Sequence, residues 1–471
     1  MTSETVLDIF KEITRIPRES GHEGPITEWL CKWAEAHGLE YKVDDIHNVC
    51  IIKNAAPGKE NVPTLVLQAH QDMVCEKNEG FEFDFSKDPI PYVIEDGWMV
   101  AKDTTLGADD GIGIAACLAL LESDRPMGRL ECIFTISEET GMDGADAMQE
   151  GFFTGKTLIN LDSEDEGQLF IGCAGGEHTD AYFEHGFENI AEGSKVLELS
   201  VTDALGGHSG DDINKLRANT VKILADFLER NESFQLVSIN GGGKSNAIAR
   251  ECKAVVASPC ADVLAADFEA YGKLVRAAYS STEPALRFSV RECEAARAVE
   301  SGAAGRIIGA LAEVPHGVVK MSPDITGLVQ TSTNLAAVSS PEPGVIKIAT
   351  SQRSSVEAEL DALVEKVAGI FRNAGARVDC YSKYPGWKPD LKSKILKDCV
   401  ESYRRLFGEE PLVLAIHAGL ECGLFLEKFP GLDMISFGPT LRGVHAPGEK
   451  LELASMDRFE ALLDDVVCNF K

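Results

Sequence analysis

The sequence predicts an α/β fold in which a domain with a mostly parallel, mixed β-sheet is interrupted by an inserted α+β domain. Three observations lead to this prediction. Short apolar strands alternate with amphipathic helices in the first part of the chain. Near residue 190 the pattern changes to strands that alternate apolar and polar residues. The chain, with 471 residues, is long enough for two or more domains.

The N-terminal part begins with two predicted helices. Residues 3–16 carry apolar side chains at helical spacing, and Pro17 ends this helix. A second helix opens at Pro25, a favoured first-turn residue, and ends at Gly38. Strands follow at 41–43, 49–53 and 64–68.

Helices and strands continue to alternate over the rest of this domain. We predict a helix at 111–122, a strand at 130–137, a short helix at 143–149 and a strand at 157–161. The strand at 64–68 (TLVLQ) is nearly all apolar, which is typical of a strand covered on both faces. The alternation therefore favours a largely parallel sheet.

The inserted domain opens on a half-exposed strand at 195–202 (KVLELSVT). A glycine-rich loop at 206–210 and a helix at 214–229 follow, and later elements are predicted at 345–350, 356–373 and 376–381. The turn-rich segment 384–389 leads back to the first domain, which ends in a strand at 434–437 and a helix from 455. We therefore expect a catalytic domain at 1–190 and 388–471, with the insertion at 191–387.

The net charge of −31 argues against phosphate-rich partners. Such a field repels nucleic acid and anionic membranes and attracts cations. The longest apolar run, at 111–121, is too short to span a bilayer, and the N-terminus has no secretory signal pattern. The 13 cysteines form no Cys-x-x-Cys pair, so we expect them to be reduced. Together these features predict a soluble cytoplasmic protein with no nucleic-acid or membrane partner.

Several residues able to bind metal or move protons lie next to predicted strands or helices. They are His70 and Asp72 after 64–68, Glu138 and Glu139 after 130–137, Asp162 after 157–161, Asp109 and Asp110 before the helix at 111, and His445 after 434–437. Ligands of open α/β sheets bind at the carboxyl ends of the strands. The repeated occurrence of histidine and carboxylate residues at successive strand ends therefore indicates a functional site.

Imidazole combined with carboxylates suits zinc, manganese or cobalt. Two metal ions about 3.5–4 Å apart need one carboxylate that bridges them and terminal ligands on each. The residues that supply this set are His70, Asp109, Glu139, Asp162 and His445.

Two neighbouring carboxylates fit supporting roles. Asp72 is two residues from His70, so it can accept the other ring N–H and fix the tautomer. Glu138 lies beside Glu139 and would point differently along an extended chain, which leaves it free to act as a base.

These segments resemble the signature of the M20 family of dinuclear zinc metallopeptidases, most closely its Xaa-His dipeptidase branch. The matching motifs run in order over essentially the whole chain. They are QAHQDMV at 68–74, TLGADDGIG at 105–113, EETGM at 138–142, NLDSE at 160–164, GGHSG at 206–210 and IHAGLECG at 416–423.

The resemblance implies a zinc-peptidase-like catalytic domain with an inserted lid, and two divalent ions, with Zn²⁺ expected and Co²⁺ or Mn²⁺ as alternatives. His70 and Asp162 would bind one ion, and Glu139 and His445 the other. Asp109 would bridge the two.

The resemblance also implies roles for residues that do not bind metal. Glu138 would be the general base, with Asp72 orienting a metal ligand. His208 of the lid would stabilise the oxyanion. Asn246 and Arg353 would bind the terminal carboxylate of the substrate or the backbone near it.

Three positions leave alternatives open. Asp110 stands where Xaa-His relatives are expected to carry Asn, so it could perturb Asp109 by like charge or replace it as the bridge. His417 and Glu421 lie a helical turn apart. We interpret them as residues behind the metal ligands or in contact with substrate, with purely structural roles as the alternative.

The resulting hypothesis is a dipeptidase for small peptides of the Xaa-His type, such as β-alanyl-histidine. An Asp at position 162 accompanies dipeptidases and aminopeptidases rather than carboxypeptidases in the family that the chain resembles. The alternatives are another amide hydrolase of M20 type, such as a tripeptide aminopeptidase or an N-acyl amino acid deacylase, and a non-catalytic binding protein. Glu138 and Asp72 argue against the last. The resemblance leaves the oligomeric state open between a monomer and a homodimer, because relatives often dimerise through the lid.

Overall fold

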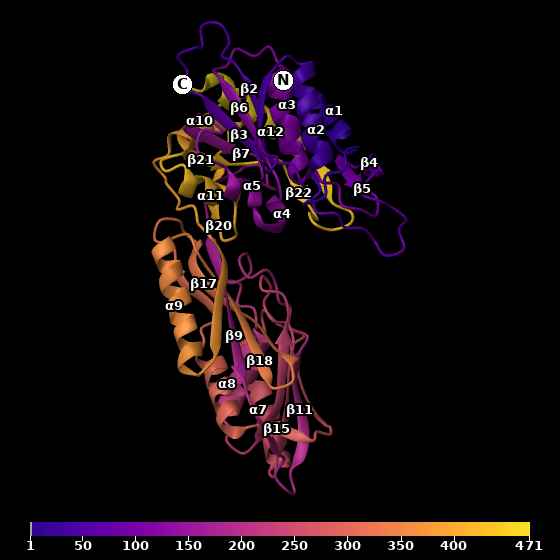
Figure 1. Cartoon of the computed structure of the whole chain (residues 1–471), viewed down its shortest axis with the longest axis vertical. Coiled ribbons are helices and arrows are strands. Elements are labelled where there is room, and N and C mark those ends of the chain that lie inside the picture. The colour runs from indigo at the N-terminus through magenta and orange to yellow at the C-terminus, as the bar shows by residue number, and fades with distance from the viewer. Residues whose placement is uncertain (1) are drawn as a thin grey trace. The chain divides into compact units, whose positions relative to one another are not determined.

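The computed structural model describes residues 2–471, which form two compact units (Figure 1). The first unit extends to Gly172 and continues through Lys388–Ala415 and Leu420–Lys471. The second comprises Cys173–Trp387 together with Ile416–Gly419. The mixed α/β architecture with an additional domain, expected from the sequence, is confirmed.

The first unit is built on an eight-stranded mixed sheet. Its strands, in spatial order, are β1 (Glu40–Val43), β2 (Val49–Lys53), β6 (Leu130–Thr135), β3 (Leu65–His70), β7 (Thr157–Asn160), β21 (Asp433–Ser436), β8 (Gln168–Cys173) and β20 (Leu412–Ile416). The central strands β6, β3, β7 and β21 run parallel, whereas β1 and β2 are antiparallel to their neighbours. The carboxyl ends of β6, β3 and β7 therefore meet at one edge.

Helices enclose this sheet, and every residue of β3 and β6 is buried. They are α1 (Ser3–Ile13), α2 (Gly24–Ala36), α3 (Ala108–Glu122), α4 (Glu138–Gly141), α5 (Asp143–Ala147), α10 (Lys394–Phe407), α11 (Glu421–Lys428) and α12 (Leu453–Asn469). Helix α3 packs on β3 and is buried over almost its whole length, which explains its continuous apolar sequence. A small sheet of β22 (Leu441–Arg442), β23 (Lys450–Glu452), β5 (Trp98–Ala101) and β4 (Tyr92–Glu95) completes the unit.

The second unit is built on a largely antiparallel sheet. The strands, in spatial order, are β14 (Arg287–Glu292), β11 (Lys195–Thr202), β13 (Cys252–Ser258), β12 (Gln235–Gly242), β17 (Val329–Glu342), β18 (Val345–Ser354), β9 (Gly175–Glu184) and β19 (Arg377–Tyr384), and β16 (Gly317–Met321) pairs with β17. A separate pair is formed by β10 (Phe187–Asn189) and β15 (Arg297–Val299). Strand β9 precedes residue 191, the expected start of the insertion, and pairs with β18 and β19.

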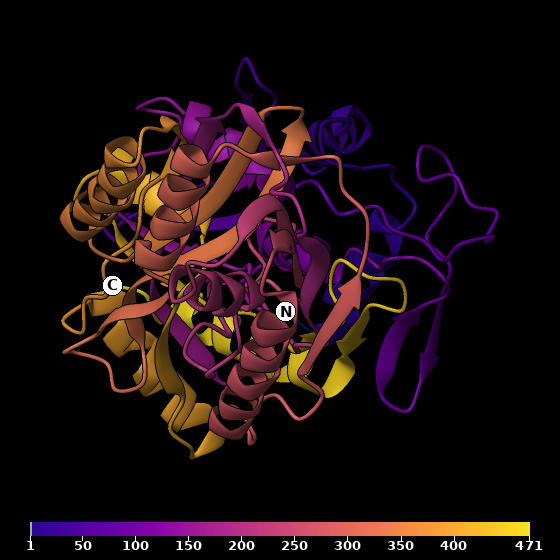
Figure 2. The same ribbon diagram turned by 90° about the horizontal axis from the view of Figure 1, so that it is seen from below.

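Four helices lie beside one another on one face of this sheet, as Figure 2 shows from below. They are α6 (Thr220–Glu229), α7 (Ala261–Ala278), α8 (Ser301–Glu313) and α9 (Glu357–Asn373). Alternate strand residues such as Leu197, Leu199 and Val201 form one apolar core with these helices. The alternating sequence of β11 is explained by this single covered face.

Element boundaries differ from the sequence predictions at a few places. Helix α6 begins at Thr220 rather than at 214, because the side chain of Asn219 accepts the N–H of Lys222 and caps it. No helix among residues 2–471 is long and apolar enough to cross a membrane. The cysteines of the described residues form no disulfide.

Candidate metal centre and active site

The expected ligands of the first unit come from three neighbouring strand ends and two loops. His70 is the last residue of β3, Glu139 lies just after β6, and Asp162 follows β7. Asp109 stands at the start of α3, and His445 lies between β22 and β23. The structure brings these five side chains together.

Asp109 lies between two imidazoles. Its Oδ1 is 3.1 Å from Nε2 of His70, and its Oδ2 is 3.2 Å from Nε2 of His445. Nε2 of His445 also lies 2.9 Å from the Glu139 carboxylate. Each oxygen of Asp109 therefore faces a different histidine.

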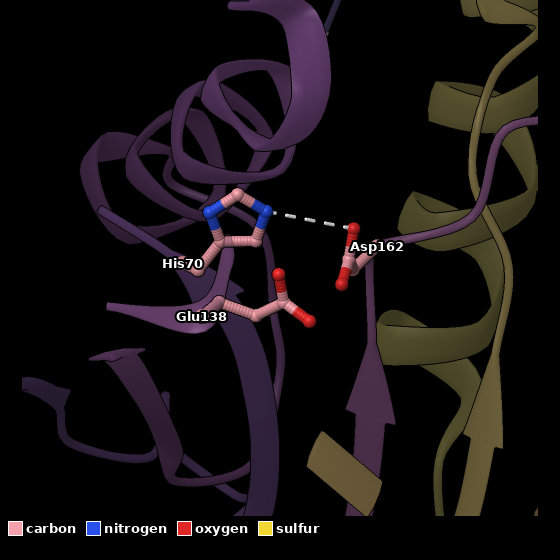
Figure 3. Close-up of side chains that lie close together, drawn as sticks. All are labelled: His70, Glu138 and Asp162. Carbon is pink, nitrogen blue, oxygen red and sulfur yellow. Dashed lines mark ion pairs between the residues drawn. The ribbon is translucent and has the colours of Figure 1, made fainter. Parts of the chain in front are cut away.

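Asp162 and Glu138 approach the same centre. Oδ1 of Asp162 lies 3.7 Å from Nε2 of His70. The side chains of His70, Glu138 and Asp162 point toward one another from different segments, with ligand atoms within 4.8 Å of one another (Figure 3). Glu138 is thus close enough either to bind an ion or to act beside it.

Asp72 ties these segments together. Its Oδ1 accepts the backbone N–H of Glu138 at 3.1 Å, and its Oδ2 accepts that of Glu139 at 3.2 Å. Nδ1 of His70 lies 3.4 Å from Oδ1, and Ser20 donates its hydroxyl to Oδ2 at 2.7 Å. Burial opposes ionisation of Asp72, but His70 and Ser20 outweigh it and lower its pKa to about 2. The ionised carboxylate fixes the orientation of its neighbours.

The side chains of Glu138 and Glu139 point in different directions, but not because the chain is extended there as expected. The two residues open the short helix α4, after Ser137 in a left-handed conformation. The Asp72 carboxylate caps this helix by accepting its first N–H groups. The prediction of an extended segment is wrong, and the helical turn separates the two side chains instead.

The centre carries more negative than positive charge. Asp109 and Glu139 raise the pKa of His445 to about 11. Burial and the charge of Asp109 raise the pKa of Asp162 to about 6. Burial, together with Asp162, raises the pKa of Glu138 well above its usual range. Within residues 2–471, the ion pairs of Asp109, Glu139 and Asp162 are all to histidine rather than to lysine or arginine.

This donor set fits divalent metal ions. Two atoms that bind one tetrahedral zinc ion at about 2.0–2.2 Å lie about 3.3 Å apart. The histidine–carboxylate separations, from 2.9 to 3.7 Å, span this value. Imidazole nitrogen with carboxylate oxygen suits zinc, cobalt or manganese, and a cation would offset the surplus of negative charge.

Among residues 2–471, neither His70 nor His445 forms an ion pair with Asp110. Its Oδ1 accepts the N–H of Gly113 at 3.1 Å, within its own helix, and its buried Oδ2 has no partner among the described residues. Burial, reinforced by the charge of Asp162, raises its pKa. Asp109 is therefore the carboxylate placed between His70 and His445.

Glu421 is fully buried beneath the strand ends. Its Oε2 accepts hydrogen bonds from Gln68 of β3 at 2.6 Å and from Thr135 of β6 at 2.8 Å. Gln68 in turn accepts from Asn160 of β7 at 2.5 Å. Burial raises the pKa of Glu421 to about 8. This network links three strands that lead into the centre, and the sequence motifs did not predict it.

The other expected site residues belong to the second unit. Nδ1 of His208 lies 3.3 Å from the backbone nitrogens of Gly210 and Asp211, which donate to it. The carbonyl of Asn246 accepts the N–H of Ser209 at 2.8 Å. The His208 loop is thus held beside Asn246 through the backbone.

Arg353 and His417 form a second group in this unit. Nη1 of Arg353 donates to the Tyr384 hydroxyl at 2.9 Å, and Nε2 of His417 lies 2.7 Å from Oγ of Ser332, which pairs with Arg353 across β17 and β18. Burial and the guanidinium lower the pKa of His417 to about 3. Nε of Arg353 and Nδ1 of His417 are buried without a partner among the described residues. The free Nε–H of Arg353 is suited to an anionic ligand.

Comparison with known proteins places this geometry in context. Residues 66–469 match the model of peptidase family M20/M25/M40. The chain is 36% identical over 476 residues to the cytosol non-specific dipeptidase of Escherichia coli, covering 99% of this chain and 98% of the relative. The crystal structure of aminoacylhistidine dipeptidase from Vibrio alginolyticus superposes with a TM-score of 0.92 at 36% identity, covering 99% of this chain and 96% of the other. An aminopeptidase of Bacillus cereus, at 17% identity and a TM-score of 0.59 over 99% of this chain and 98% of the other, shares the fold.

Proposed function

This chain belongs to peptidase family M20/M25/M40, and from that premise we propose that it is a dipeptidase acting on Xaa-His dipeptides such as β-alanyl-histidine. It is a metallopeptidase, and dinuclear metal binding is characteristic of the family. The observation that carries the proposal is Asp109, whose two oxygens face His70 and His445 separately. This is the arrangement that a bridging ligand requires.

We propose that Asp109 bridges two divalent ions, with Zn²⁺ expected and Co²⁺ or Mn²⁺ as alternatives. His70 and Asp162 would hold one ion, and Glu139 and His445 would hold the other. Ions at these positions would supply Lewis acidity for the scissile carbonyl and lower the pKa of a water molecule.

Glu138 is proposed to move the proton. It accepts a proton from the attacking water and delivers it to the leaving nitrogen. Its carboxylate lies within 4.8 Å of ligand atoms of His70 and Asp162, so it can reach a water molecule held at that position. Asp72 holds the backbone of Glu138 in place.

The second unit is proposed to supply the groups that recognise the substrate. Arg353 presents a planar fork for the terminal carboxylate, and its partnerless Nε–H supports this role. Asn246 would bind the nearby backbone, and His208 would stabilise the oxyanion. The buried contacts of Glu421 favour a role in holding strand ends over direct contact with substrate.

Assembly and location remain part of the proposal. We expect a homodimer formed through the second unit acting as a lid, and cytoplasmic location, which agrees with the name of the Escherichia coli relative. Small peptides are the expected partners.

A dipeptide panel tests the proposed activity. Purified protein, freed of metal and reloaded with Zn²⁺, should hydrolyse β-alanyl-histidine and other Xaa-His dipeptides faster than tripeptides or N-acyl amino acids. Preference for tripeptides would favour a tripeptide aminopeptidase, and preference for N-acyl amino acids a deacylase. Hydrolysis of all substrates at the same rate with and without metal would contradict the proposal.

A further inference from the structure

Glu449 makes an unusual set of contacts four residues beyond His445. Its side chain is buried, with 2% of its surface exposed. Oε2 accepts the backbone N–H groups of Leu106 at 2.8 Å and Gly107 at 3.0 Å, and Oε1 accepts that of Ala108 at 2.8 Å. The N–H of Asp109 lies within 3.4 Å of Oε1. One carboxylate therefore accepts from four successive backbone N–H groups of residues 106–109, which we call the Asp109 loop and which lead into α3.

Arg18 holds the same loop from another side. Its buried guanidinium donates to the carbonyls of Gly107, of Gln71 at 3.1 Å and of Asp72 at 2.8 Å. The carbonyl of Arg18 also accepts the N–H of Met73 at 3.0 Å. Arg18 thus joins the Asp109 loop to the segment that follows His70.

Gly107 is required for this arrangement. Its φ of +68° lies in the left-handed region, and an added Cβ would collide with Arg18 and Met73. The loop can enclose the guanidinium only where a side chain is missing.

Backbone contacts complete the link to His445. The carbonyl of Glu449 accepts the N–H of Ala101 at 3.0 Å, and Gly448 donates to Thr104 at 2.9 Å. The segment after His445 is therefore hydrogen-bonded to residues that precede the Asp109 loop and also to the loop itself. Its register relative to Asp109 is set by these contacts.

We propose that Glu449 and Arg18 are positioning residues that align the Asp109 loop with the His70 and His445 segments, so that Asp109 can hold both metal ions. The inference rests on the proposed metal site and adds the elements that set its geometry. Both side chains act through backbone atoms of the loop and of residues 71–72, not through the side chains proposed as metal ligands. Because Asp109 would contact both ions, a change in its loop should lower the affinity for both. Loss of a terminal ligand such as Asp162 should lower the affinity for one ion more than for the other.

Glu449→Gln is a sharp probe. Glutamine keeps the shape but replaces one acceptor oxygen with an NH₂ group, which would face two backbone N–H donors. Glu460→Gln is the matched control, since Glu460 is also a buried glutamate of the first unit but its Oε1 has no partner among the described residues. Asp162→Asn serves as the comparison for a single ion.

The measurement is Zn²⁺ affinity of metal-free protein by competition with a chromophoric chelator, with thermal unfolding of the metal-free form as a check on folding. We expect Glu449→Gln to bind both ions about 10–100-fold more weakly, while Glu460→Gln binds as wild type. If Glu449→Gln does not fold, Arg18→Lys provides the same test, because lysine cannot bridge the three carbonyls.

Two outcomes separate the claims. If folded Glu449→Gln or Arg18→Lys binds both ions with wild-type affinity, the positioning role is wrong and the proposed function stands. If wild-type protein itself binds no Zn²⁺, the proposed metal site is wrong, and the positioning role falls with it.

Discussion

His445 places its Nε2 3.2 Å from Oδ2 of Asp109, a residue 336 positions earlier in the chain. The opposite oxygen of Asp109 faces His70, so one carboxylate separates two imidazoles. As hydrogen bonds, these two contacts require a proton on Nε2 of both rings, whereas bound cations would satisfy the same atoms with Nε2 unprotonated. The surplus of carboxylates around the centre is what the proposed pair of cations would balance.

Glu138→Gln should abolish most activity without loss of metal. We expect kcat to fall about 10²–10⁴-fold, because the amide cannot accept the proton of the attacking water. Metal content measured by plasma mass spectrometry should equal that of wild type and of Glu150→Gln, an exposed control. Loss of one ion in Glu138→Gln would instead make Glu138 a ligand, as its proximity to His70 and Asp162 also allows.

Arg353→Lys should impair recognition of the substrate's carboxylate. A lysine ammonium cannot form the bidentate contact of a guanidinium, so kcat/KM for a dipeptide should fall about 10–100-fold. The amidated dipeptide lacks the carboxylate, so its kcat/KM should differ little between wild type and Arg353→Lys. Arg377→Lys, on the exposed strand β19 of the same sheet, is the control. Equal losses for the acid and the amide would rule out carboxylate recognition by Arg353.

Stability should fall below neutral pH because of His316. Nδ1 of His316 accepts hydrogen bonds from Asn219 and from the N–H of Leu335, both at 3.3 Å, and burial lowers its pKa to about 4. The unfolded chain, with a pKa of about 6.5, binds this proton first, so roughly 2–3 kcal/mol of stability is lost as pH falls from 6.5 to 4. Urea unfolding of His316→Asn should show a flatter pH dependence in this window. The exposed control His22→Asn should keep the wild-type slope, and an unchanged slope in His316→Asn would contradict the assignment.

Removing metal should destabilise the protein. The carboxylates of Asp109, Glu139 and Asp162 lie close together, and their repulsion is left uncompensated in the metal-free form. At a hundredfold excess of ion over Kd, binding adds about 2.7 kcal/mol of stability. Calorimetry should therefore show a higher Tm with Zn²⁺ than without, and little gain with Ca²⁺, which prefers oxygen ligands. Identical Tm values with and without Zn²⁺ would argue against a metal centre.

The positions of many site residues could be predicted because strand ends are visible in the sequence. The apolar runs before His70, Glu138 and Asp162 identify three strands, and parallel order brings their carboxyl ends to one edge. The sequence left Asp110 as an alternative to Asp109, because both are aspartates. The direction of each side chain depends on the backbone conformation at the start of α3, which the sequence does not show.

Contacts to the backbone escaped prediction entirely. Glu449 recognises N–H groups about 340 residues away, and Arg18 recognises carbonyls. Such groups are the same in every residue, so no residue pattern marks them. Ser332 and Tyr384, which contact His417 and Arg353, were missed for a related reason, because their pairing depends on strand register.

The number of metal ions bound per chain tests the central claim most directly. Native mass spectrometry of metal-free protein reloaded with Zn²⁺ should show two ions per chain in wild type. Asp109→Asn should bind fewer, because an NH₂ group, which does not bind zinc, replaces one of the two bridging oxygens. A dipeptidase that is fully active with one ion or none, or an Asp109→Asn variant that retains both ions, would contradict a centre bridged by Asp109.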